Sequence, residues 1–127
     1  MVRLFGFSIF VVSFSAFANE CYGEKTEIDM SECTTERYKS LDKELNVVYR
    51  AKMLELDSIK IHSDGANVKP VSYYLKMSQL AWIKMRDADC DLETYESMGG
   101  TGYDSIYHNC LADKTRDRIN KIKAMMY

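Results

Sequence analysis

The sequence predicts an all-α fold, a disulfide-stapled bundle of three main helices. Three observations favour this fold. Apolar residues recur every three or four positions over long stretches, no β alternation of useful length occurs, and the chain holds four cysteines. The chain has 127 residues, and the part from residue 19 to 127 is long enough for one compact domain and too short for two cores.

The first eighteen residues have the features of a secretory signal peptide. Arg3 precedes an apolar stretch from Leu4 to Val12, and the segment ends in the small-residue pattern Ala16-Phe17-Ala18. We expect cleavage after Ala18, which leaves residues 19–127 as one periplasmic or secreted domain without a stable membrane anchor. A retained anchor is the alternative, but the apolar run is shorter than the roughly 20 residues that span a bilayer.

All four cysteines, Cys21, Cys33, Cys90 and Cys110, follow the predicted cleavage site. In an exported chain, four cysteines indicate disulfides and allow three pairings. We favour Cys21 with Cys33 and Cys90 with Cys110, because each short loop would remove about 3 kcal/mol of unfolded-chain entropy. A crossed pairing that joins Cys33 to Cys90 stays open. With no Cys-x-x-Cys pair and two distant histidines, we expect neither a zinc site nor another cofactor.

The first helix is expected to begin near Thr26 and to end near Ile61. Thr26 with Asp29 has capping-box-like spacing, and Asp29 with Glu32 offers a second possible start. The apolar stripe that would face the core comprises Leu41, Leu45, Val48, Tyr49, Met53, Leu56 and Ile59.

The second helix is expected from about Lys69 through at least Cys90, with Pro70 in its first turn. Its expected inward face comprises Tyr74, Ser78, Ala81, Trp82 and Met85. Thr101 with Asp104 has the spacing to cap a third helix. The stripe of that helix comprises Leu111, Thr115, Ile119, Ile122 and Met126.

Three motifs distinguish this chain from an anonymous helical bundle. The first helix carries Asp42, Leu45, Asn46 and Tyr49, the second carries Gln79, Trp82, Arg86, Asp87 and Cys90, and the third carries Cys110, Thr115 and Arg118. In these motifs the chain resembles the lysozyme-inhibitor LprI N-terminal-like family, and the resemblance covers nearly all of residues 19–127. It implies a small exported helical domain that binds a protein.

The family motifs also have a structural interpretation. On one helix, Trp82 and Arg86 lie one turn apart, so the guanidinium can lie against the indole. We expect Asp42, Asn46, Gln79, Arg86 and Arg118 to form an interhelical polar network beneath Trp82, in which each buried group finds a partner.

The glycine-rich segment is the candidate partner-contact loop. It comprises Gly99, Gly100, Thr101, Gly102 and Tyr103, and a Cys90–Cys110 bridge would hold its base. Loops on rigid scaffolds often carry function. Such a loop would insert into the two-carboxylate cleft of a lysozyme-type glycosidase. The alternative is that the glycines only reverse the chain before the third helix.

Charge and motifs narrow the possible functions. The formal charge of −2, which becomes −3 without Arg3, gives no support to nucleic-acid binding and suits a basic protein such as lysozyme. No catalytic motif is present, and the acidic run from Asp87 to Glu93 is more typical of a solvated surface than of paired glycosidase acids. The basic stretch Lys114 to Lys123 would suit an anionic polymer or lipid, although the helix dipole accounts for it.

The sequence therefore predicts a lysozyme inhibitor that occludes the active-site cleft and is not an enzyme. The alternative is a periplasmic adaptor or immunity-type protein that binds another envelope enzyme or toxin.

Overall fold

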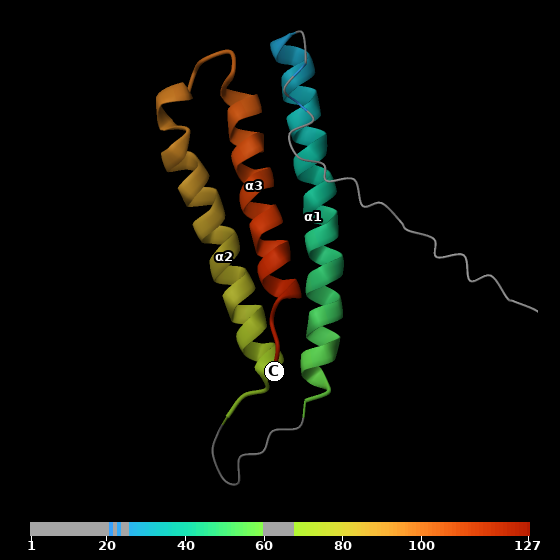
Figure 1. The fold of residues 1–127 in the computed structure, drawn as a ribbon. Helices are drawn as coiled ribbons and strands as arrows, with labels where there is room; N and C mark the ends of the chain where they lie inside the picture. Colours follow the sequence, from blue (N-terminus) through green and yellow to red (C-terminus); the bar gives the residue numbers. More distant parts are fainter. Residues whose placement is uncertain (1–20, 22, 24–25, 60–67) are drawn as a thin grey trace, which may run out of the picture.

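The computed structural model describes residues 21, 23, 26–59 and 68–127. Three helices, α1 (Glu27–Asp57), α2 (Val71–Glu93) and α3 (Tyr103–Lys123), run up and down beside one another, and a short 3-10 helix, η1 (Tyr95–Ser97), follows α2 (Figure 1). No strand occurs among the described residues. The predicted all-α bundle of three helices is confirmed, whereas the predicted signal peptide, residues 1–18, lies outside the described residues.

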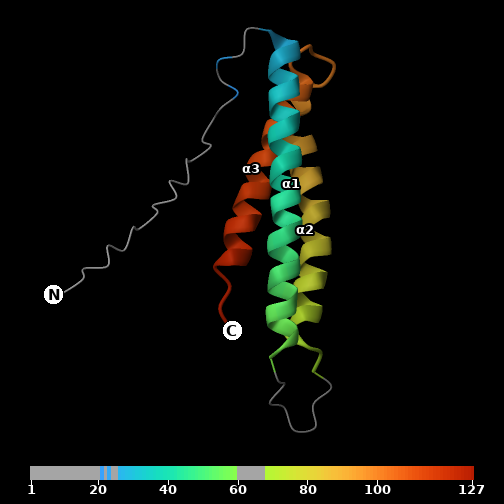
Figure 2. The ribbon, with the colours of Figure 1, turned by 90° about the vertical axis from the view of Figure 1, so that its right-hand side faces the viewer.

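The three axes lie roughly along one direction, which makes the molecule elongated (Figures 1 and 2). The N-terminus of α1, the C-terminus of α2 and the N-terminus of α3 meet at one end. We call this end the loop end, and it comprises residues 26–36 and 87–110.

The apolar core is small and lies mainly between α1 and α3. Leu45 of α1 packs with Ile119 and Ile122 of α3, and partly buried apolar side chains surround them: Leu41, Val48, Tyr49, Trp82 and Met125. Trp82 is the contribution of α2 to this cluster. Elsewhere on α2 the buried apolar side chains are Leu75 and the disulfide-bonded Cys90.

Helix α1 begins at the predicted capping residue but ends before the predicted position. The Thr26 side chain accepts a hydrogen bond from the Asp29 amide at 3.1 Å, as a capping residue does. The helix ends at Asp57, earlier than the predicted Ile61, which lies outside the described residues. Ser58 and Ile59 instead make tight hydrogen bonds to carbonyls three residues back.

The predicted inward face of α2 was wrong. Tyr74, Ser78, Ala81 and Met85 are exposed, and Trp82 is half-buried. The buried side chains are Ser72, Leu75, Gln79, Arg86 and Cys90. Helix α2 is rotated about its own axis relative to the predicted orientation. This orientation lets Cys90 reach Cys110 and lets Gln79 and Arg86 find polar partners inside the bundle.

The ends of α2 and α3 differ from prediction in three details. Pro70 is the N-cap of α2 and does not lie within its first turn. Gly102, with no side-chain cap, precedes α3 in place of the predicted Thr101 cap. Met126 lies beyond the end of α3 and is 91% exposed, while the neighbouring Met125 packs on the core.

Truncating Ile122 tests the core. Ile122 is fully buried, so Ile122→Ala removes apolar contacts and leaves a cavity. We expect the free energy of unfolding to fall by about 2–5 kcal/mol. Urea unfolding of the oxidised protein measures this loss. Met126→Ala is the control and should change stability by less than about 0.5 kcal/mol. Equal stability of the two variants would show that the core lies elsewhere.

Candidate functional site

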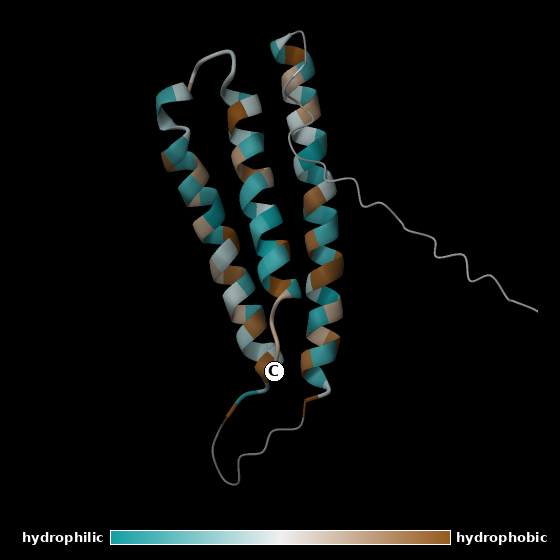
Figure 3. Ribbon diagram, viewed as in Figure 1, coloured by the Kyte–Doolittle hydropathy of each residue, from teal (hydrophilic) through white to brown (hydrophobic). Residues whose placement is uncertain are grey.

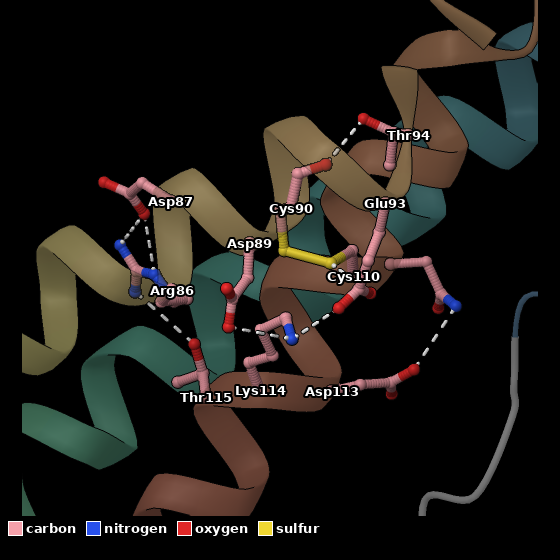
Figure 4. The surroundings of a disulfide bond; sticks show 11 residues. Arg86, Asp87, Asp89, Cys90, Glu93, Thr94, Cys110, Asp113, Lys114 and Thr115 are labelled. Atoms are coloured by element: carbon pink, nitrogen blue, oxygen red, sulfur yellow. Dashed lines mark hydrogen bonds and ion pairs between the residues drawn. A yellow bond between two sulfur atoms is a disulfide. The ribbon is translucent and has the colours of Figure 1, made fainter. Parts of the chain in front are cut away.

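Two disulfides hold the loop end together. Cys21 is bonded to Cys33 on α1, and Cys90 on α2 is bonded to Cys110 on α3, with Cα–Cα distances of 5.7 and 5.8 Å. These are the favoured pairings, so the crossed pairing is excluded. Cys90–Cys110 fixes the last turn of α2 against α3 (Figure 4). The loop between these helices is therefore closed at its base by a covalent bond.

Hydrogen bonds and ion pairs brace the same end. Lys114 reaches Glu93 at 2.8 Å and Asp89 at 3.5 Å, beside the disulfide (Figure 4). The hydrogen bond to Glu93 raises the pKa of Lys114 above its usual value, and burial opposes that shift. On the other side of α3, Arg37 of α1 binds Asn109 and Asp113.

The loop reverses the chain by way of η1 and one left-handed glycine. Gly99 has φ of 80°, a conformation that side chains disfavour. Amides of Gly100 and Tyr103 donate to carbonyls within the loop at 3.0 and 3.3 Å. Gly99, Gly100 and Thr101 are exposed, whereas Gly102 and Tyr103 are half-buried. The tip of the loop is thus an exposed and internally bonded turn.

Charge is strongly segregated along the molecule. The loop end holds ten acidic residues and no lysine or arginine: Glu27, Asp29, Glu32, Glu36, Asp87, Asp89, Asp91, Glu93, Glu96 and Asp104. The remaining described residues, 37–59, 68–86 and 111–127, hold fourteen basic and six acidic residues. The small net charge of the chain is therefore the sum of an acidic loop end and a basic remainder, which we call the basic body. Within the loop end, residues 97–103 carry no charge.

The second cluster of motif residues surrounds Trp82. The guanidinium carbons of Arg86 and Arg118 lie 5.1 and 5.6 Å from the centroid of the indole ring. Both arginines are buried, and both lie within cation–π range of the ring. Burial lowers the pKa of Arg118, although a guanidinium stays charged at neutral pH. Trp82 therefore contacts a buried cation from its own helix and one from α3.

Each arginine has polar partners. Arg86 donates to Asp87 at 2.9 Å and to the buried Thr115 hydroxyl at 3.5 Å, as Figure 4 shows. One of its nitrogens lies 3.8 Å from Asp42. Arg118 donates to Gln79 and Ser78, both at 2.9 Å. The polar groups form two arms, one around each arginine, and not a single continuous network.

Three motif residues of α1 lie outside this arrangement. Asn46 is exposed and donates only to the Asp42 carbonyl of its own helix, at 2.9 Å. Its expected place in the interhelical network was wrong, because its amide bonds the backbone of its own helix and stays in solvent. Leu45 and Tyr49 belong to the apolar core.

The sequence analysis missed two neighbours of the network. Tyr38 lies with its ring 5.5 Å from the Arg86 guanidinium, and burial raises the pKa of its hydroxyl. Arg37 links α1 to α3, and its Nε atom is buried without a partner among the described residues. The i, i+4 pair Asn109 and Asp113 on α3 was the available signal for Arg37.

A shallow groove of about 460 Å³ runs between α2 and α3. It is lined by Ser78, Ala81, Trp82, Met85, Arg86, Asp89, Lys114, Asp117, Arg118 and Lys121. No group of three or more His, Cys, Asp or Glu residues in the described part of the chain could hold a metal ion. None of the described helices is long and apolar enough to cross a bilayer.

Comparison with known proteins connects this architecture to one family. The family model described as lysozyme inhibitor LprI matches residues 18–122. An uncharacterised protein of Rhizobium meliloti (strain 1021) is 33% identical over 110 residues, which cover 84% of this chain and 78% of that protein. No solved structure gives a significant match. The matched segment contains both disulfides, the loop and the Trp82 cluster.

Replacing Arg86 tests whether the Trp82 cluster stabilises the fold. Asp87 and Asp42 are partly exposed, so their ion pairs with Arg86 contribute little. Arg86→Ala also removes the stacking on Trp82 and the hydrogen bond to Thr115. We expect the free energy of unfolding to fall by about 1–3 kcal/mol in urea. Arg50→Ala, at an exposed position on α1, is the control. Unchanged stability with lost partner binding would instead make Arg86 a contact residue.

Proposed function

Because the chain belongs to the lysozyme inhibitor LprI family, we propose that it is an exported protein that binds a lysozyme-type muramidase and occludes its active-site cleft. The acidic loop end carries this proposal, together with the neutral, exposed glycine turn at its tip. Residues 19–127 would form the mature domain after removal of residues 1–18. The two disulfides are typical of proteins from oxidising compartments.

Electrostatics favours the loop end as the docking surface. The loop end holds ten carboxylates. Cations of the adjoining body pair with only four of them, Glu36, Asp87, Asp89 and Glu93. The excess of negative charge creates a field that attracts a cationic enzyme. The basic body would repel the same enzyme. A basic lysozyme would therefore approach the end of the bundle where α2 and α3 are joined.

The uncharged tip suits a glycosidase cleft. Such clefts contain two carboxyl groups, so an acidic tip would meet like charges there. Residues 97–103 avoid that repulsion and offer the Thr101 and Tyr103 hydroxyls as hydrogen-bond partners. Glu96 and Asp104 flank the tip, where they would face the basic rim of the cleft. The loop is already ordered by its own hydrogen bonds and by Cys90–Cys110, which lowers the entropy cost of binding.

An inhibition assay tests the proposal. We expect the oxidised chain from residue 19 to slow lysis of purified peptidoglycan by c-type or g-type lysozyme in a dose-dependent manner. A sample that has been reduced, alkylated and freed of reductant should lose this effect, because the loop base is no longer fixed. Removing the reductant spares the disulfides of the lysozyme itself. If the folded protein inhibits neither enzyme, the inhibitor proposal fails and the adaptor or immunity-type alternative is favoured.

Two sets of variants test the docking surface. Asp91→Asn with Glu96→Gln should weaken inhibition about tenfold at low salt, because both exposed acids lie at the loop end. Asp57→Asn with Asp117→Asn changes the net charge equally on the basic body and should have little effect. Deleting Gly100 and Thr101 should abolish inhibition while the melting temperature stays near that of the parent. A folded deletion variant that inhibits normally would rule out insertion of the loop.

A further inference from the structure

The outer side of α2 is unusually apolar for an exposed helix surface. Tyr73, Tyr74, Met77, Leu80 and Met85 are between 43 and 57% exposed. At 100° per residue they fall on one arc, opposite the buried Leu75, Gln79 and Arg86. Figure 3 shows more white and brown residues on this part of α2 than toward its C-terminus. We call these five residues the α2 outer face.

Positive charge lies at both edges of this apolar arc and within it. Residues 68–86 contain four basic residues and no acidic residue. Lys76 is exposed at one edge of the arc, and Lys84 is exposed within it, between Tyr73 and Met77 in helical projection. No described residue forms an ion pair with either lysine. On the other side, Lys121 of α3 lines the groove beside Met85. The α2 outer face thus combines exposed apolar side chains with unpaired lysines.

The combination of apolar side chains and lysines indicates which kind of partner can bind the α2 outer face. A basic lysozyme would be repelled by the lysines, and its proposed contact lies at the acidic loop end. In a symmetric dimer through this face, the lysines of one copy would face the lysines of the other. An anionic bilayer satisfies both features, because headgroups attract lysines while the interfacial region accepts Met, Leu and Tyr side chains.

We propose that the α2 outer face binds reversibly to the surface of an anionic phospholipid membrane. From Tyr73 to Met85 the face extends about 18 Å along the helix axis. Helix α2 would lie parallel to the membrane, with its apolar arc in the headgroup region and with Lys76 and Lys84 at the phosphates. The loop end would project along the surface and stay free to bind a protein. The proposal does not depend on lysozyme inhibition.

Vesicle sedimentation tests this proposal with the oxidised chain from residue 19, which lacks the apolar N-terminal segment. We expect binding to vesicles of mixed phosphatidylglycerol and phosphatidylcholine, weakening as salt is raised, and little binding to phosphatidylcholine alone. Lys76→Gln with Lys84→Gln should weaken partitioning about fivefold for each lysine removed. Met77→Ser with Leu80→Ser should weaken it about tenfold or more.

Matched variants on α1 control for general changes in charge and hydropathy. Val47→Ser with Leu54→Ser and Lys43→Gln with Arg50→Gln alter exposed apolar and basic residues of α1, and should leave partitioning unchanged. Circular dichroism checks that every variant is folded. No binding to anionic vesicles, equal binding to neutral vesicles, or equal losses in the α1 variants would overturn the proposal. It would also be overturned if the α2 variants only dispersed a dimer or released an acidic protein.

Discussion

The stacking of Arg86 and Arg118 against Trp82 is the interaction on which the rest of the structure depends. Helices α1 and α3 share the main apolar cluster, to which α2 adds the partly buried Trp82, and α2 buries one further large apolar side chain, Leu75. Polar contacts of the two arginines and the Cys90–Cys110 bridge therefore hold α2 in place and fix its rotation. That rotation decides which α2 residues face solvent and where the loop begins.

Separation of charge gives the two ends of the molecule different binding properties. An acidic end with a neutral tip suits a cationic enzyme, whereas a basic body with an apolar helix surface suits an anionic membrane. A chain with interspersed charges would have the same net charge and neither property. The α2 outer face lies toward the N-terminal part of α2, whereas the loop end lies at the C-terminus of that helix. A molecule bound to a membrane through the α2 outer face could therefore still present its loop to a partner.

The sequence predicted the features that depend on local chemistry. Helix periodicity, the Thr26 cap and the pairing of nearby cysteines required only short-range spacing. The inward face of α2 could not be predicted in this way, because apolar periodicity selects Tyr74 and Met85 while buried Gln79 and Arg86 find partners on α3. Charge segregation also escaped prediction, since it appears only when the helix ends are brought together.

Hydrogen exchange of the chain, free and with an excess of lysozyme, tests the central claim most directly, because it reports where a partner contacts the molecule. We predict slower exchange in the complex at residues 96–104 and at the adjoining helix ends, with residues 73–85 unchanged. Protection of residues 73–85 with an unaffected loop would contradict the account. So would an absence of protection anywhere in a correctly oxidised protein.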